Sequence, residues 1–324
     1  MLETIMSVRG TSTGDQASYL WFQGLTFAHS TYMRPSQYGF LDAQAGQYNL
    51  TAAADNRQTV GRPAAGVVVA NANHIRFERN LFAQMAATGL DLVSGTHDDL
   101  IIGNVFTQIG GSGVSVGKFT ADETTEYHVP YNPADPSEIC TNDVLKNNYI
   151  NDVTTEIQGA CGIACGYPRN IDIEHNEVTG TNFTGISVGY GWTSSPNAMS
   201  NNHINYNNIH GVAKVLAGGA GISTQSNQGP ASEMRYNYLH DIGQAPWADY
   251  AVQGLYLDEG TTGYTVAHNV MVDTPGVLLA PSAGANTLVD NGAAPAGGQA
   301  TTASAGIEPG YADIKNFTIP PASF

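Results

Sequence analysis

A short phrase that recurs along the chain constrains the fold more than any other feature. Each copy sets an Asn between apolar residues and is followed by a Gly-apolar-x-apolar phrase, as in LIIGNVF before GVSV and INYNNIH before GIST. A constant strand-turn-strand core with connections of variable length predicts a solenoid whose coils stack alike while their loops differ. The repeated residues, spaced 24 to 44 positions apart, are Asn80, Asn104, Asn148, Asn176, Asn207, Asn237 and Asn269.

The alternation of apolar residues beside each Asn predicts strands rather than helices. Side chains at alternate positions of a strand point to one face, so each coil would send a row of apolar side chains inward, one strand spacing of about 4.8 Å from the next row. Asn suits the bend because it tolerates left-handed backbone conformations, and its amide can pair with the Asn of the next coil as a ladder. No stretch has a helical period long enough to compete, so the chain is predicted to be all-β.

Composition agrees with a turn-rich β protein and narrows the class of partner. The 324 residues include 37 Gly and 15 Pro, and the formal net charge is −16 with only 12 Lys and Arg. Such a charge opposes binding to nucleic acid or to an anionic membrane surface, so neutral substrates are favoured as partners. No apolar run approaches a transmembrane span. The first residues, MLETIMSVRG, lack the pattern of a signal peptide, which suggests a cytoplasmic protein or a chain without its natural start.

Three segments can be separated along the chain. Residues 1–60 are expected to form an irregular first coil or cap, residues 61–280 the regular coils, and residues 281–324 a C-terminal loop and cap. The Ala, Gly and Thr stretch at 291–306 is expected to be a mobile loop. The apolar residues of GIEPGYADIKNF, which follows, are expected to dock on the last coil and cover its strand edge.

Neither a cofactor nor a metal is predicted. The three cysteines, Cys140, Cys161 and Cys165, are too few for a disulfide framework, although a Cys140–Cys161 bridge is possible, and Cys165 is expected to point into the core. No spacing supports a zinc site. Calcium could bind Asp98 and Asp99 of THDDL, but paired Asp residues in a turn are usually only solvated.

The strand GLYLDEG is the best candidate for chemistry on the outer face of the coils. Its leucines should face inward, so Tyr256 and Asp258 should face outward, and stacking would place Ser223 beside Tyr256 and Gln225 beside Asp258. Tyr190 and Trp192 stand at the exit of a neighbouring strand in GISVGYGW. We expect a shallow surface of hydroxyls, an amide and aromatic rings around a carboxylate, an arrangement that suits sugar binding.

Asp258 and Glu259 are the candidate catalytic acids, because adjacent carboxylates at a strand end can be given different pKa values. They could equally be ordinary turn residues. A second acid could come from the loop HDIGQAPWADYAVQ, which would bring Asp241, Asp249, Trp247 and Tyr250 to the same face. His210 and His240, three residues after their ladder Asn, should stack on neighbouring coils at the start of the loops leading to this face, as sugar or metal ligands or as solvated surface residues.

These motifs carry a resemblance to a known family. WFQGLTFAHSTYMRPSQYGF, the Asn repeat, GISVGYGW, GGAGIST and above all GLYLDEGTTGYTVAHNVM resemble right-handed parallel β-helix glycoside hydrolases, and most closely glycoside hydrolase family 141 and its relatives. The resemblance implies a single-stranded right-handed parallel β-helix, activity on plant cell-wall sugars such as xylan cleavage or fucose removal, and an extracellular or periplasmic location.

The resemblance also implies a catalytic role for Asp258 and shows a departure from the family pattern. Family members often carry an Asp before the Gly-Gly of the preceding strand, where this chain has Ala217 and Gly218 in LAGGAGIST. The usual carboxylate pair is therefore incomplete, and Asp249, Asp241 or Glu259 would have to substitute.

Three functions are compatible with these residues. The first is a glycoside hydrolase acting on a polysaccharide or oligosaccharide. The second is a polysaccharide lyase, which needs basic side chains to neutralise the carboxylate of a uronate. The basic residues expected on this face are chiefly Lys118 and Lys214. The third is a glycan-binding β-helix without catalysis. The sugar, the stereochemical outcome and the oligomeric state are left open by the sequence, and fold alone does not decide among the three.

Overall fold

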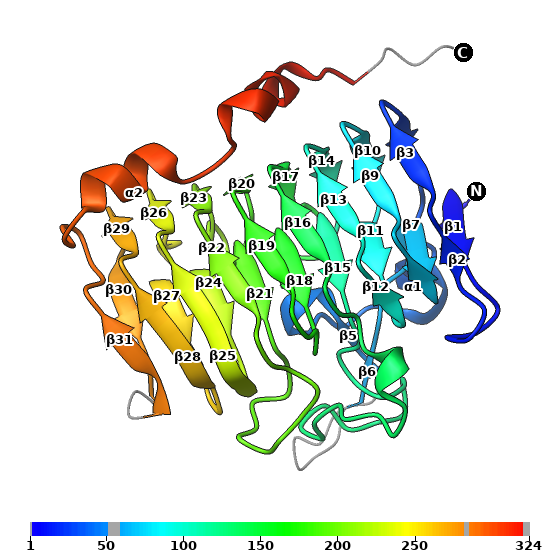
Figure 1. Cartoon of the computed structure of the whole chain (residues 1–324), viewed down its shortest axis with the longest axis horizontal. Helices are drawn as coiled ribbons and strands as arrows, with labels where there is room; N and C mark the ends of the chain where they lie inside the picture. The colour runs from blue at the N-terminus through cyan, green and yellow to red at the C-terminus, as the bar shows by residue number, and fades with distance from the viewer. Residues whose placement is uncertain (1, 51–58, 282–284, 320–324) are drawn as a thin grey trace.

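The computed structural model describes residues 2–50, 59–281 and 285–319, and the chain forms a parallel β-helix (Figure 1). Three sheets run along the solenoid, and each coil contributes one strand to each sheet, except that the last coil, with β30 (Gly276–Leu279) and β31 (Thr287–Val289), adds none to the sheet that ends at β29 (Val270–Val272). All pairings within these three sheets are parallel, as the sequence predicts for stacked coils. No helix in the described part of the chain is long and apolar enough to cross a membrane.

The sheets are named here by their edge strands. The β1–β30 sheet contains β1 (Met6–Arg9), β7 (Ala65–Ala70), β11 (Thr88–Leu92), β15 (Val114–Val116), β18 (Ile163–Cys165), β21 (Ile186–Val188), β24 (Ala220–Thr224), β27 (Gln253–Leu257) and β30 (Gly276–Leu279). The β4–β29 sheet contains β4 (Thr26–Ala28), β10 (Leu81–Met85), β14 (Val105–Ile109), β17 (Tyr149–Val153), β20 (Glu177–Thr179), β23 (Asn208–His210), β26 (Tyr238–His240) and β29 (Val270–Val272). The β3–β31 sheet contains β3 (Trp21–Gln23), β9 (Arg76–Glu78), β13 (Leu100–Ile102), β16 (Val144–Lys146), β19 (Asp172–Glu174), β22 (His203–Asn205), β25 (Asn227–Arg235), β28 (Thr262–Ala267) and β31 (Thr287–Val289).

The interior is the predicted apolar column. In the β1–β30 sheet, Ile163, Ile186, Ile222 and Leu255 pair in register and are fully buried. Aromatic rings fill the N-terminal coils, where Phe82 and Phe106 stack with centroids 4.5 Å apart. Apolar burial along this column is the main stabilising contribution to the fold.

The Asn ladder is present and continues to Asn291. Each ladder Asn donates its backbone N–H and its Nδ2 to the Oδ1 of the Asn one coil on, as Asn176 does to Asn207 at 3.0 and 3.1 Å. The left-handed backbone lies one residue earlier than we expected, at the residue before each ladder Asn, as at His175 (φ 53°) and Tyr206 (φ 56°). The ladder Asn is thus selected for its amide and not for its backbone.

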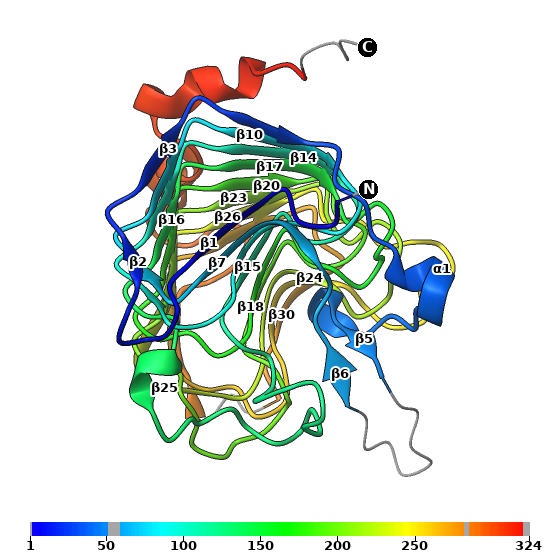
Figure 2. The same cartoon turned by 90° about the vertical axis from the view of Figure 1, so that its right-hand side faces the viewer.

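The N-terminal segment contributes a full set of strands and then leaves the coils. Strands β1, β3 and β4 pair with β7, β9 and β10, and β2 (Ala17–Ser18) pairs with β8 (Ala72–Asn73), which also pairs with β12 (Thr96–His97). Residues 29–50 and 59–64 then form an excursion with α1 (Arg34–Tyr38), the 3-10 turn η1 (Gln44–Gly46) and an antiparallel pair of β5 (Tyr48–Asn49) and β6 (Val60–Gly61). Figure 2 shows α1, β5 and β6 beside the β1–β30 sheet, outside the coils.

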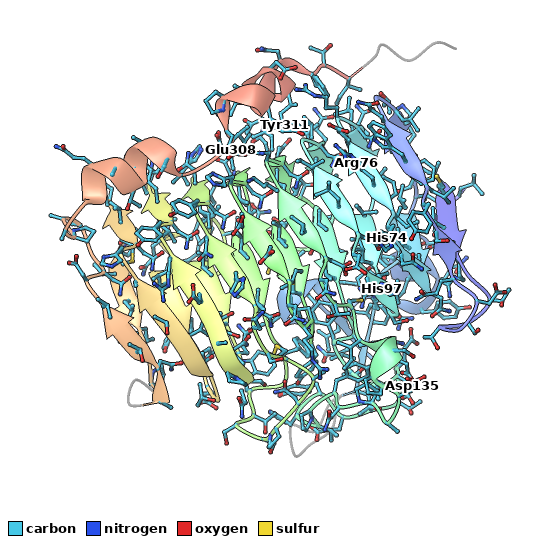
Figure 3. All side chains as sticks on the ribbon, in the orientation of Figure 1. His74, Arg76, His97, Asp135, Glu308 and Tyr311 are labelled. Carbon is cyan, nitrogen blue, oxygen red and sulfur yellow. The ribbon has the colours of Figure 1, made fainter. Side chains whose placement is uncertain are left out.

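The C-terminal segment differs from expectation in two respects. The low-complexity stretch expected to be a mobile loop contains α2 (Gly298–Ser304), which packs on β29. The following turn, η4 (Pro309–Asn316), lies along the earlier coils and not on the last coil: Asn147 and Glu308 exchange hydrogen bonds, and Arg79 pairs with Asp313. Figure 3 shows Glu308 and Tyr311 at this edge of the coils, near Arg76. The 3-10 turn η2 (Pro136–Glu138) lies in the loop between β15 and β16, on the side of the molecule opposite η4 (Figure 2).

Candidate functional site

A cavity of about 860 Å³ lies where the excursion meets the strand ends and loops of the β1–β30 sheet. Its volume is within the range of small-molecule sites. The wall combines carboxylates, aromatic rings and amides. It is lined by Asp42, Ala43, Gln44, Asn49, Val60, Tyr127, His128, Gln158, Gly159, Phe183, Tyr190, Trp192, Leu216, Ala217, Asp258 and Glu259.

Asp258, the strongest candidate from sequence, lies in this wall directly after β27. Its Oδ2 accepts a 2.7 Å hydrogen bond from Nε1 of Trp192, and its Oδ1 accepts the N–H of Glu259 at 2.8 Å. The carboxylate is therefore held on both oxygens while the residue stays half-buried. Such a fixed carboxylate in a cavity can act as a base, a nucleophile or an acceptor for sugar hydroxyls.

Aromatic rings form the adjoining wall. Tyr190 and Trp192 pack with ring centroids 5.2 Å apart, and Tyr127 meets Trp192 edge to face at 5.5 Å. Tyr190 is buried, so it supports the indole, while Trp192 and Tyr127 are only half-buried. Apolar ring faces beside carboxylates suit a ligand that has both apolar C–H faces and hydroxyl groups, as a sugar has.

Asp42 also lines the cavity, and the sequence analysis did not single it out. Its Oδ2 accepts the Gly159 N–H at 2.6 Å, whereas its Oδ1 is buried without a hydrogen-bond partner among the described residues. Burial raises the pKa of this carboxyl above its ordinary value, and the Gly159 N–H acts in the opposite direction. No repeat marks the excursion that carries Asp42, so its position could not be read from the periodic pattern.

The outward residues of the sheet have the predicted register but lie deeper than expected. Ser223 pairs with Tyr256, and Ser187 pairs with Ser223. Gln225 accepts a hydrogen bond from Ser187 and donates one to Ser223, and all three are buried. The expected shallow surface of hydroxyls is thus a buried network, and these residues do not line the cavity. Tyr256 is half-buried, with its hydroxyl 3.5 Å from that of Tyr250.

The structure places one of the other candidate acids in the cavity wall and two outside it. Glu259 is exposed and lines the cavity beside Asp258. Asp241 and Asp249 are exposed and are not part of the cavity wall. Trp247 is also outside that wall, 72% exposed, and its Nε1 donates to the carbonyl of Val215 at 3.0 Å.

His210 and His240 stack as predicted but belong to another sheet. Their rings lie 4.8 Å apart, on β23 and β26 of the β4–β29 sheet. His210 Nε2 is 3.5 Å from a carboxylate oxygen of Glu177, and His240 Nδ1 is 2.6 Å from one of Asp241. The loops that lead to Ser223 of β24 and to Tyr256 of β27 begin directly after these histidines, as expected, but neither histidine lines the cavity that contains Asp258.

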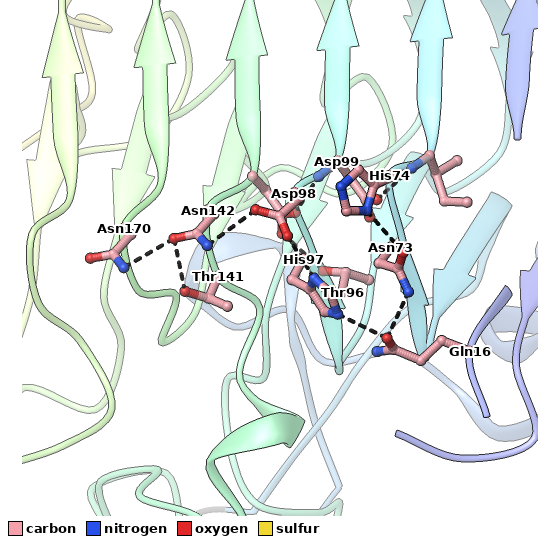
Figure 4. Close-up of polar contacts among 12 residues, drawn as sticks. Gln16, Asn73, His74, Thr96, His97, Asp98, Asp99, Thr141, Asn142 and Asn170 are labelled. Carbon is pink, nitrogen blue, oxygen red and sulfur yellow. Dashed lines mark hydrogen bonds and ion pairs between the residues drawn. The ribbon is translucent and has the colours of Figure 1, made fainter. Parts of the chain in front are cut away.

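Asp98 and Asp99, the candidate calcium ligands, make hydrogen bonds to other residues of the chain. Asp98 accepts one hydrogen bond from Asn142 and pairs with His97, as Figure 4 shows. Asp99 is buried, and its Oδ1 accepts a hydrogen bond from the N–H of Ile75. The three cysteines are buried and free, so the possible Cys140–Cys161 bridge is not formed. Among the described residues, no group of three or more His, Cys, Asp or Glu side chains is placed to hold a metal ion.

The cavity wall carries negative charge. Asp42, Asp258 and Glu259 line it together with His128, and no Lys or Arg of the described chain does. The two bases considered for a lyase, Lys118 and Lys214, are therefore not positioned in this wall to neutralise a substrate carboxylate.

Comparison with known proteins identifies the architecture. A family model described as right handed beta helix region matches residues 65–294. The chain belongs to this right-handed β-helix family. Among solved structures, a protein named glycoside hydrolase is 32% identical with a TM-score of 0.86, over 96% of this chain and 54% of the other, so the chain spans about half the length of that protein.

Two further comparisons add no argument on function. The Streptococcus pneumoniae surface protein and adhesin PfbA aligns over 89% of this β-helix chain and 83% of its own, but with 10% identity and a TM-score of 0.24. No curated protein matches the sequence. The comparisons therefore establish the right-handed β-helix family of the chain and do not test the residues of the cavity.

Proposed function

We propose that this β-helix protein is a glycoside hydrolase that cleaves a neutral plant cell-wall polysaccharide or oligosaccharide, with Asp258 as the carboxylate at the reacting centre. The observation that carries the proposal is the fixed position of Asp258, held by the Trp192 indole in the wall of an 860 Å³ cavity. The 32% identical structure named glycoside hydrolase supports the reaction class. The plant cell-wall substrate comes from the resemblance to glycoside hydrolase family 141.

The charge of the cavity favours hydrolysis of a neutral sugar over the lyase alternative. Elimination next to a uronate requires neutralisation of the substrate carboxylate, commonly by Lys, Arg or a cation. The wall offers the carboxylates of Asp258 and Glu259 in place of such groups. A uronate would meet repulsion there, while sugar hydroxyls would find acceptors.

Ala217 bears on the third alternative, a glycan-binding protein without catalysis. It lines the cavity at the position where the resemblance implies a second catalytic acid. A hydrolase of this kind therefore needs another acid in the same cavity. Without one, the cavity would bind a glycan and leave it intact.

The test is incubation of the protein with a panel of plant polysaccharides that includes xylan and fucosylated xyloglucan. New reducing ends and unsaturated-uronate absorbance are read together, for the wild type, Asp258→Asn and the control Asp249→Asn, whose carboxylate lies outside the cavity. Reducing ends without absorbance, lost only in Asp258→Asn, would support the proposal. Absorbance would point to a lyase, and retained binding without cleavage would point to a non-catalytic protein.

A further inference from the structure

We infer that Asp42 is the proton-donating acid of this cavity and replaces the carboxylate missing at Ala217. The inference rests on the proposed function and adds a catalytic residue to it. Both Asp42 and Ala217 line the cavity that contains Asp258, but Asp42 reaches it from the N-terminal excursion and not from a coil. Asp42 and Glu259 therefore both line the same cavity as Asp258, and of these two carboxyls only Glu259 is exposed.

The surroundings of Asp42 shift its carboxyl toward the protonated form. One oxygen accepts the Gly159 N–H, and the other is buried without a hydrogen-bond partner in the described part of the chain. No cation of the described chain lines the cavity, and the titratable neighbours there are Tyr127, His128, Tyr190, Asp258 and Glu259. Burial raises the pKa of Asp42, which is the direction required of a general acid.

The backbone around Asp42 fixes the position of this carboxyl. Asn49 Nδ2 donates to the backbone carbonyl of Asp42 at 3.1 Å, and the Gly46 N–H donates to the carbonyl of Gly159 at 3.1 Å. A Cβ at Gly159 would approach both carboxylate oxygens of Asp42 to 3.1 Å and the carbonyl of Ala43 to 3.0 Å, which is closer than ordinary contact. The excursion is thus tied to the loop before β18 at the point where the acid is needed.

The contrast between Asp42 and Asp258 matches the two roles of glycoside hydrolysis. The proton of Asp42 would pass to the glycosidic oxygen as the bond from that oxygen to the anomeric carbon breaks, and the bonding electrons would leave with the oxygen. A water molecule, activated by Asp258 or hydrolysing a glycosyl ester of Asp258, would supply the hydroxyl of the anomeric carbon. The proton of that water would restore the one lost from Asp42, so the sum is one water per bond cleaved.

The test compares substrates that differ in their need for an acid. Phenyl and 2,4-dinitrophenyl glycosides of β-xylose and α-fucose are used, because a dinitrophenolate leaves without protonation. We expect Asp42→Asn to lower kcat/KM on the phenyl glycoside by about 10²- to 10⁴-fold and on the dinitrophenyl glycoside by less than about 10-fold. The alkaline limb of the pH profile should also disappear. Asp241→Asn, an exposed carboxylate outside the cavity, should leave all of these values at the wild-type level, and thermal unfolding checks that each variant is folded.

The outcomes separate this inference from the proposed function. Two results would show that Asp42 is not the acid while the hydrolase proposal stands, provided that Asp258→Asn abolishes hydrolysis. In the first, Asp42→Asn has the same activity as Asp241→Asn. In the second, Asp42→Asn loses activity on both glycosides equally and keeps the alkaline limb of the pH profile. If the wild type cleaves neither the glycosides nor the polysaccharides, both proposals are wrong. Partial recovery of phenyl glycoside hydrolysis in Asp42→Asn combined with Ala217→Asp would show directly that Asp42 supplies the missing acid.

Discussion

The indole of Trp192 and the carboxylate of Asp258 form a 2.7 Å hydrogen bond between residues on different coils. Trp192 follows β21 and Asp258 follows β27, so two connections of the solenoid meet in one cavity. The bond holds the carboxylate of Asp258 against the aromatic wall that Trp192 forms with Tyr190 and Tyr127.

Replacing Trp192 with Phe tests this relationship. The ring would keep most of its packing, but Asp258 would lose the donor that holds its Oδ2. Because hydrogen bonds to charged groups contribute about 1.5–3 kcal/mol, we expect kcat/KM to fall by about 10-fold or more with little change in unfolding temperature. Trp247→Phe is the matched control, since that indole donates to the carbonyl of Val215 outside the cavity. Equal activity of the two variants would contradict the role given to Trp192.

The sequence predicts the solenoid well because the repeat is local. Alternation and spacing were sufficient for the Asn ladder and for the pairing of Ser223 with Tyr256. They were insufficient for Asp42, because the excursion that carries it has no repeat and the position of Asp42 depends on contacts with distant loops such as that of Gly159. For the same reason the burial of Ser223 and Gln225 could not be predicted from their outward register.

The Asn ladder should contribute strongly to stability. Replacing Asn176 with Ala would remove the acceptor of the Asn148 N–H and the donor to the carbonyl of Leu145 inside a buried column. Since each unsatisfied buried group costs about 1–3 kcal/mol, the free energy of unfolding should fall by about 3 kcal/mol or more. Urea unfolding would measure this, with Asn151→Ala on β17, outside the ladder, as the control. A loss no larger than that of Asn151→Ala would show that the ladder is dispensable.

The buried carboxyls of Asp99 and Asp143 should make stability depend on pH. Burial, reinforced by the charge of Asp143, raises the pKa of Asp99 to about 9, and burial also raises the pKa of Asp143. The folded protein therefore holds protons that the unfolded chain, with carboxyl pKa values near 4, has already released. The contribution of these two carboxyls to the free energy of unfolding should be fully present below about pH 4, and it should be lost as the pH rises toward 9.

Replacing Asp99 with Asn should flatten this dependence. An Asn already occupies the matching position in a later coil, where Asn202 Oδ1 accepts the N–H of Ile171 as Asp99 Oδ1 accepts that of Ile75. We expect a gain of about 1–3 kcal/mol at alkaline pH and a smaller one at acidic pH. Urea unfolding at pH values of about 5, 7 and 9 would show it, with the exposed Asp241→Asn as control. Parallel pH profiles for wild type and Asp99→Asn would contradict the assignment.

The C-terminal segment should detach when the fully buried side chain of Ile314 is shortened. Ile314 of η4 packs on Leu81, Ala83 and Val105. Because truncation of a buried Ile to Ala costs about 2–5 kcal/mol, Ile314→Ala should open the segment locally while the coils stay folded. Chymotrypsin should then cleave faster after Tyr311 and Phe317, with a small change in the main unfolding transition. Leu288→Ala, at a partly exposed side chain of β31, should leave the cleavage rate unchanged, and equal rates for both variants would show that polar contacts alone hold the segment.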